Sequence, residues 1–247
     1  MAIGLNLDPE GPVSSSLTKL ANIALINVWF IVCSIPVFTI GASFTAMMDV
    51  AWRMTKNREG TGITKAFFHA FKVNFKKGTL IWLIQLVFIA LLYVDYRIIG
   101  HQMNLNGGAE MAAYIVFGVL VLIVAFTSWY SLTLTAIFDN TVIQTIKNGL
   151  LISIARFPWS LLIACCYLSP LILLIVPART AFFCVPFLLL VWFGATALGA
   201  AYLFRHALAP FLPEGYDETP VDEIIPDEDL YPDDYPPSPD PDNKNDE

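Results

Sequence analysis

Residues 112–138, AAYIVFGVLVLIVAFTSWYSLTLTAIF, are predominantly apolar and contain no charged side chain. A run of about 18 or more apolar residues is long enough to cross the hydrocarbon core of a bilayer as a helix. Inside lipid, a chain must pair its own backbone N–H and C=O groups, which a helix does within one segment. The run therefore predicts a membrane-spanning helix and an all-α fold.

Four more apolar runs accompany this one, and the whole chain has the composition of a membrane protein. Of its 247 residues, 56% are hydrophobic and 14% charged, against about 25% charged in soluble domains. We predict a polytopic bundle of about five transmembrane helices. The predicted spans are residues 17–36, 78–99, 112–138, 158–177 and 180–204, within a transmembrane domain of residues 17–211 that follows an N-terminal segment, 1–16.

The C-terminal segment, residues 212–247, differs sharply from the rest. It holds 14 of the 21 acidic residues, 8 of the 16 prolines and a single base, Lys244. Such a segment buries too little apolar surface to offset its ordering entropy, so we expect a disordered tail. The remaining body has 13 basic and 7 acidic residues. This balance suits an anionic lipid leaflet, and no nucleic-acid-binding module is visible.

Motifs of catalysis are missing from the sequence. It contains no HExxH, GxSxG, P-loop or glycine-rich nucleotide fingerprint, and its three histidines lie far apart. The four cysteines fall inside apolar runs without metal-type spacing, which is typical of packing residues. We therefore expect no enzymatic activity, no cofactor and no metal.

Basic residues are distributed unevenly between the predicted loops. Residues 53–77 carry seven lysines and arginines, whereas the next connection, 97–111, has only Arg97. Loops rich in lysine and arginine stay on the cytoplasmic side. With five spans, the N-terminus is predicted outside and the acidic tail in the cytoplasm.

Residues 63–77, ITKAFFHAFKVNFKK, have the period of an amphipathic helix. Basic side chains recur at i, i+4, i+7 and i+11, and phenylalanines occupy the opposite face and its flanks. We predict an interfacial helix that binds anionic lipid; the alternative is a helix packed on the protein's own inner face. The residues predicted to face lipid or a partner are Lys65, Phe67, Phe68, His69, Phe71, Lys72, Asn74, Phe75 and Lys76.

Polar residues inside the predicted spans are candidate functional positions, because lipid makes them costly. Asn22 and Asn27 lie in the first span, and Thr127, Ser131 and Thr135 form a row at i, i+4 and i+8 in the third. Hydroxyls in membrane helices commonly bond their own i−4 carbonyl or a neighbouring helix. A helix–helix seam is the first interpretation, and a substrate path is the alternative.

Residues 34–42, SIPVFTIGA, interrupt the first apolar run. Pro36 lacks an N–H and disfavours helix at the residue before it, while Thr39 can cap a new helix and Gly41 permits close packing. From Leu17 to Pro36 a helix would rise roughly 28 Å, so we place the hinge at the cytoplasmic boundary. Residues 40–54 are then expected to run along the inner face; a mid-membrane ion site is the alternative.

The sequence also resembles a known family, closely in two runs and more loosely from about residue 5 to residue 212. The run LANIALINVWFIVCSIPVFTIGASFTAM, followed by FFHAFKVNFKKGTLIW, is similar to the YesL-like family of bacterial integral membrane proteins, a domain of unknown function. The positions that carry the resemblance are Asn22, Asn27, Trp29, Pro36, Thr39, Gly41, Ala42, Phe68, Phe71, Asn74, Phe75 and Lys76. The acidic tail is not a family feature.

The resemblance implies a multi-pass protein of the bacterial cytoplasmic membrane, whose relatives often lie beside genes for carbohydrate ABC transporters and sugar-responsive sensors. It supplies no ligand or catalytic residues. We therefore expect a non-enzymatic accessory or regulatory subunit that contacts an ABC permease or a membrane sensor. A small permease or channel is the alternative, and a scaffold acting through the tail is a third; the oligomeric state stays open.

Overall fold

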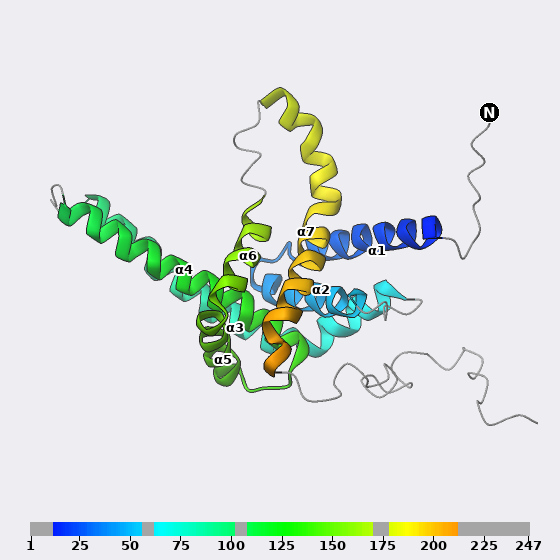
Figure 1. The fold of residues 1–247 in the computed structure, drawn as a ribbon, viewed down its shortest axis with the longest axis horizontal. Helices are drawn as coiled ribbons and strands as arrows, with labels where there is room; N and C mark the ends of the chain where they lie inside the picture. Colours follow the sequence, from blue (N-terminus) through cyan, green and yellow to red (C-terminus); the bar gives the residue numbers. More distant parts are fainter. Residues whose placement is uncertain (1–11, 56–61, 102–107, 170–177, 212–247) are drawn as a thin grey trace, which may run out of the picture. The chain divides into compact units, whose positions relative to one another are not determined.

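The computed structural model describes residues 12–55, 62–101, 108–169 and 178–211, and every element in these ranges is helical (Figure 1). The acidic tail and most of the N-terminal segment lie outside the described residues. The elements in chain order are α1 (Pro12–Cys33), η1 (Val37–Thr39), α2 (Ile40–Met54), α3 (Ile63–His101), α4 (Gly108–Ile137), α5 (Val142–Ala155), α6 (Phe157–Leu168), α7 (Ala178–Leu208) and η3 (Ala209–Phe211).

Two helices of the described chain, α3 and α4, are long and apolar enough to cross a membrane. The count rises to three if α5 and α6, which meet at 103°, form one broken span. The apolar part of α1, Leu17–Cys33, is shorter. An all-helical protein with two or three candidate spans is thus established.

The sequence predicts an interfacial helix at residues 63–77 and a separate span at 78–99. The structure instead has one continuous helix of 39 residues. At about 1.5 Å per residue it is roughly 58 Å long, about twice the hydrocarbon thickness. Because Gly78 keeps helical geometry, no break separates the lysine-bearing turns from the apolar ones.

Helix α2 lies within the bundle and not along a surface, which corrects the expectation for residues 40–54. It contacts α1, α3, α4 and α7, and nearly all its residues are buried (Figure 1). Its small and apolar side chains occupy every side of the helix, so each side can pack. Its charges, Asp49 and Arg53, are one turn apart and form an ion pair of 2.9 Å, which permits burial.

The junction before α2 follows the predicted break. Helix α1 ends at Cys33, and a single 3-10 turn, η1, follows Pro36. Thr39 occupies the N-cap position of α2 but makes no side-chain cap, contrary to expectation. Its hydroxyl lies instead 2.6 Å from the Cys33 carbonyl and 2.7 Å from the Pro36 carbonyl, so it ties the new helix back to the end of α1.

Glycines mark the places where helices approach most closely. A Cβ on Gly41 would overlap the Gly78 carbonyl and the Trp82 Cβ of α3, and one on Gly78 would lie 3.0 Å from the Ala42 Cα. The Trp82 indole also donates to the Val37 carbonyl at 2.8 Å. The backbones of α2 and α3 can therefore touch only because both positions lack a side chain.

A sharp bend joins α5 to α6 beside a buried hydrogen-bond network. Arg156 at the bend has φ −113° and ψ 38°, and a proline lies in the first turn of α6. The Ser160 hydroxyl lies 3.0 Å from the Tyr130 hydroxyl and 2.8 Å from the Ser153 carbonyl. Because α6 and α4 share this network, the bend is fixed by contacts with a third helix.

Candidate interaction sites

The first turns of α3 expose a row of basic side chains, which we call the lysine face: Lys65, His69, Lys72 and Lys76. The three lysines are exposed and His69 is half-buried. Thr64 accepts a 3.2 Å hydrogen bond from the Trp29 indole, which fixes these turns against α1. The lysine face is therefore open while the helix that carries it is anchored.

The phenylalanine side of the same turns packs partly inside the protein. Phe67 is fully buried, and Phe71 and Phe75 are half-buried; Phe68 is exposed but meets the Trp29 ring edge-on at 4.8 Å. The Asn74 amide donates to the Ala70 carbonyl at 3.1 Å. The phenylalanine side therefore packs on the protein itself, as the alternative prediction stated. The lysine face is the part that stays available to lipid or a partner.

Asn27 connects α1 to α7. It is fully buried, and its amide oxygen accepts a 3.1 Å hydrogen bond from the Gly194 N–H. A Cβ on Gly194 would overlap the Ile23 carbonyl, so the two backbones are in contact here. Asn22, one turn earlier, is half-buried. Of the two asparagines, Asn27 has a clear role in helix packing.

The hydroxyl row of α4 is largely turned back on its own helix. Thr127 donates to the Ile123 carbonyl at 2.7 Å, and Thr135 donates to the Ser131 carbonyl at 2.8 Å. Ser131 is fully buried, and a Cβ on Gly149 of α5 would lie 2.5 Å from its hydroxyl oxygen. The row therefore forms a close α4–α5 contact at its centre.

Gln85 of α3 is a polar residue whose burial and hydrogen bonding could not be predicted from the sequence. Its side chain is only 4% exposed, and neither its amide oxygen nor its amide nitrogen has a hydrogen-bond partner in the described part of the chain. An amide buried without partners is costly. Sequence showed a glutamine in a span, but its environment depends on how α3 packs.

Among the described residues, Asp49 pairs with Arg53 and Lys77 pairs with Asp139. Burial raises the pKa of the Asp49 carboxyl, and the nearby Arg53 and His69 oppose that shift. Lys77 of α3 pairs with Asp139, which follows α4, and its hydrogen bond lowers the pKa of Asp139. The Lys77 pair joins the middle of α3 to the segment that follows α4.

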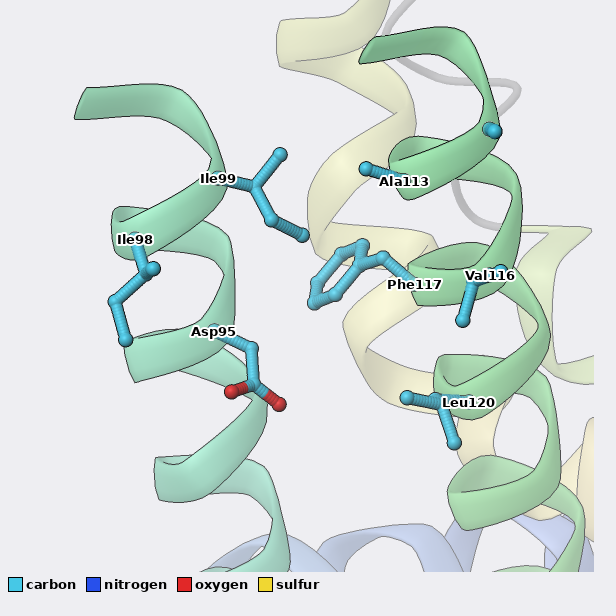
Figure 2. Close-up of a pocket in the computed structure, with 8 residues that line it drawn as sticks. Asp95, Ile98, Ile99, Ala113, Val116, Phe117 and Leu120 are labelled. Atoms are coloured by element: carbon cyan, nitrogen blue, oxygen red, sulfur yellow. The ribbon is translucent and has the colours of Figure 1, made fainter. Parts of the chain in front are cut away.

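The opposite ends of α3 and α4 enclose a concave site, the hairpin groove, with a volume of 410 Å³. Asp95, Ile98 and Ile99 line it from α3, and Ala113, Phe117 and Leu120 from α4; Figure 2 shows the Asp95 carboxylate directed into the space between the helices. Its lining is apolar except for this carboxylate. The groove can hold an apolar group that carries a positive charge.

In the described ranges, no three His, Cys, Asp or Glu residues lie close enough together to bind a metal ion. The features with unmet interactions are the lysine face, the hairpin groove and the exposed apolar surface of α3 and α4. The exposed apolar helices are compatible with a membrane protein.

The comparison with known families agrees with the resemblance read from the sequence. Residues 23–96 match the family model described as "Protein of unknown function, DUF624", the family called YesL-like. The match runs from α1 through α3 and includes the hinge, α2 and the lysine face. No curated protein and no solved structure matches the chain.

Proposed function

We propose that the protein is a non-enzymatic accessory or regulatory subunit that binds a permease or a sensor within the bacterial cytoplasmic membrane. The proposal is carried by the two exposed surfaces of α3, lysines at one end and a broad apolar surface at the other. A helix of this kind offers one surface to acidic groups and another to helices or lipid.

The topology of the proposal has five spans, with the N-terminus outside and the tail in the cytoplasm. Helices α1, α3, α4, α6 and α7 overlap the five predicted spans. The lysine face then lies on the cytoplasmic side, where each base near anionic lipid contributes about 1 kcal/mol of attraction. The link to carbohydrate uptake comes from the family resemblance alone.

The test is crosslinking in native membranes, followed by detergent extraction and mass spectrometry of the recovered complex. We expect a permease or sensor with the wild type, and at least tenfold less of it with the double variant Lys65→Glu, Lys72→Glu. Lys147→Glu, which reverses an exposed lysine on α5, is the matched control and should retain the partner. Recovery of the wild-type protein alone contradicts the proposal.

A small permease or channel is the second candidate, and the partnerless amide of Gln85 favours it, since polar groups in a span can line a solute path. Purified protein in vesicles distinguishes this candidate from the first. Flux of an oligosaccharide or ion that Gln85→Leu abolishes would support a permease. Absence of flux with several solutes would rule it out.

A further inference from the structure

Asp95 is a carboxylate on a span-forming helix without a partner. It makes no ion pair or hydrogen bond with any other residue that the structure describes. Its nearest base in sequence, Arg97, projects from another side of the helix and lies 3.4 Å from the Tyr93 hydroxyl. Asp95 is exposed, and a carboxylate on a candidate span offers a contact for a cation.

The lining of the hairpin groove indicates what carries that cation. The rings of Tyr96 and Phe117 meet at 5.9 Å and set the register of the two antiparallel helices. Ile99 and Ala113 lie about one turn from the Tyr96–Phe117 contact, toward the end where α3 finishes and α4 begins. Leu120 lies about one turn from that contact in the opposite direction. Apolar surface therefore extends on both sides of the Asp95 carboxylate.

This arrangement favours a helix over a lipid-like molecule. An amphiphile has its charge at one end. With that headgroup at Asp95, its apolar chain could cover the lining on one side of the carboxylate only, and the lining on the other side would face polar atoms or water. A transmembrane helix can place one basic residue opposite Asp95 with apolar residues before and after it. Ala112 and Ala113 are small, and small residues allow a helix to approach closely.

The surface around the groove is also apolar and exposed. Met111, Val116 and Val119 of α4 are half or more exposed, as are Leu91 and Val94 of α3. In the described structure no atom of another element lies within 4 Å of a Cβ placed on Gly118. A third helix laid over the hairpin would cover this surface together with the groove.

We propose that the hairpin groove docks a transmembrane helix of the partner protein, and that a lysine or arginine of this helix pairs with Asp95. The inference rests on the proposed function, since it names the surface through which an accessory subunit would hold its partner. The groove can nevertheless be tested without the native partner, so the two can fail separately.

The test uses synthetic transmembrane peptides of about 20 leucine and alanine residues. Three versions carry lysine, leucine or glutamate at one position near the end that matches the depth of Asp95. Purified full-length protein, labelled at one site, is reconstituted in bilayer nanodiscs with labelled peptide, and binding is measured by energy transfer. We expect the lysine peptide to bind at least tenfold more tightly than the leucine peptide, and the glutamate peptide more weakly still.

Two variants of the protein locate the contact. Asp95→Asn should remove the preference for lysine but leave the weak binding of the leucine peptide. Ala113→Trp fills the groove and should weaken all three peptides. Glu110→Gln removes another exposed carboxylate from the same end of α4 and should change nothing. Equal binding of the three peptides by the wild type overturns the proposal, as does a lysine preference that survives in Asp95→Asn.

Other occupants give distinct results. Asp95-dependent binding of dodecylamine in the absence of any lysine-peptide preference would make the groove an amphiphile site and overturn the proposal. Asp95-dependent dimers of the protein without peptide would assign the groove to a second copy, with the same consequence. If the peptides fail but the permease or sensor is still recovered by crosslinking, the accessory role stands and the groove assignment falls.

Discussion

Replacing Gly41 by alanine tests whether α2 packs directly on α3. The new methyl group would overlap the Gly78 carbonyl and the Trp82 Cβ, and one of these atoms is backbone. Forcing an extra carbon into a packed contact costs about 3 kcal/mol at the upper end of the usual range. The better helix propensity of alanine returns about 1 kcal/mol, so we expect a net loss of about 2 kcal/mol.

Gly118→Ala is the matched control, because it makes the same substitution in a helix where no other element lies within 4 Å of the added Cβ. The assay is thermal unfolding of each purified protein in one detergent, followed by circular dichroism. A loss of about 2 kcal/mol corresponds to a midpoint lowered by roughly 4–8 °C in a protein of this size.

Gly118→Ala should leave the midpoint unchanged or raise it slightly, since only the propensity gain applies. If Gly41→Ala unfolds at or above the wild-type temperature, the α2–α3 contact is absent and the central position of α2 is wrong. If both variants lose stability equally, the loss comes from a general property of glycine in these helices and not from the contact.

Two buried polar side chains and a pair of carboxyl groups give three further predictions. Gln85→Leu should stabilise the protein by about 1–3 kcal/mol, measured by the same thermal assay, because it removes a buried amide without partners; destabilisation would show that the amide has one. Asn27→Leu should destabilise by about 1 kcal/mol because the hydrogen bond between α1 and α7 is lost, and an unchanged midpoint would contradict that hydrogen bond. The stability of the wild type, measured against pH, should separate two carboxyl groups. Relative to Asp49→Asn, the wild type loses stability as pH rises from about 3.9 through the raised pKa of Asp49. Relative to Asp139→Asn, it loses stability as pH falls from about 3.9 through the lowered pKa of Asp139, and slopes of the same sign would contradict one assignment.

Sequence reasoning was most reliable where the signal is local. Apolar length alone located α3 and α4, because a span is defined by its own composition. The family resemblance also rested on contiguous residues and was confirmed over residues 23–96. The break at Pro36 followed from the missing N–H of proline, and α1 ends three residues before it.

The position of α2 could not be read in the same way. Asp49 and Arg53 are charged, but their spacing of four residues lets them neutralise each other inside a bundle. Gly41 was recognised as permitting close packing, whereas its contact with Gly78 depends on how two distant segments meet. The hairpin groove likewise exists only when α3 and α4 pair in one register, so the sequence did not single out Asp95.

Photo-crosslinking from single positions in the native membrane tests the accessory role most directly. A photoreactive residue would replace Phe68 beside the lysine face, Val119 on the exposed hairpin, or fully buried Ala46 of α2 as the control. The account predicts adducts with a permease or sensor protein from Phe68 and Val119, and none from Ala46. Adducts with lipid alone from both exposed positions would contradict it.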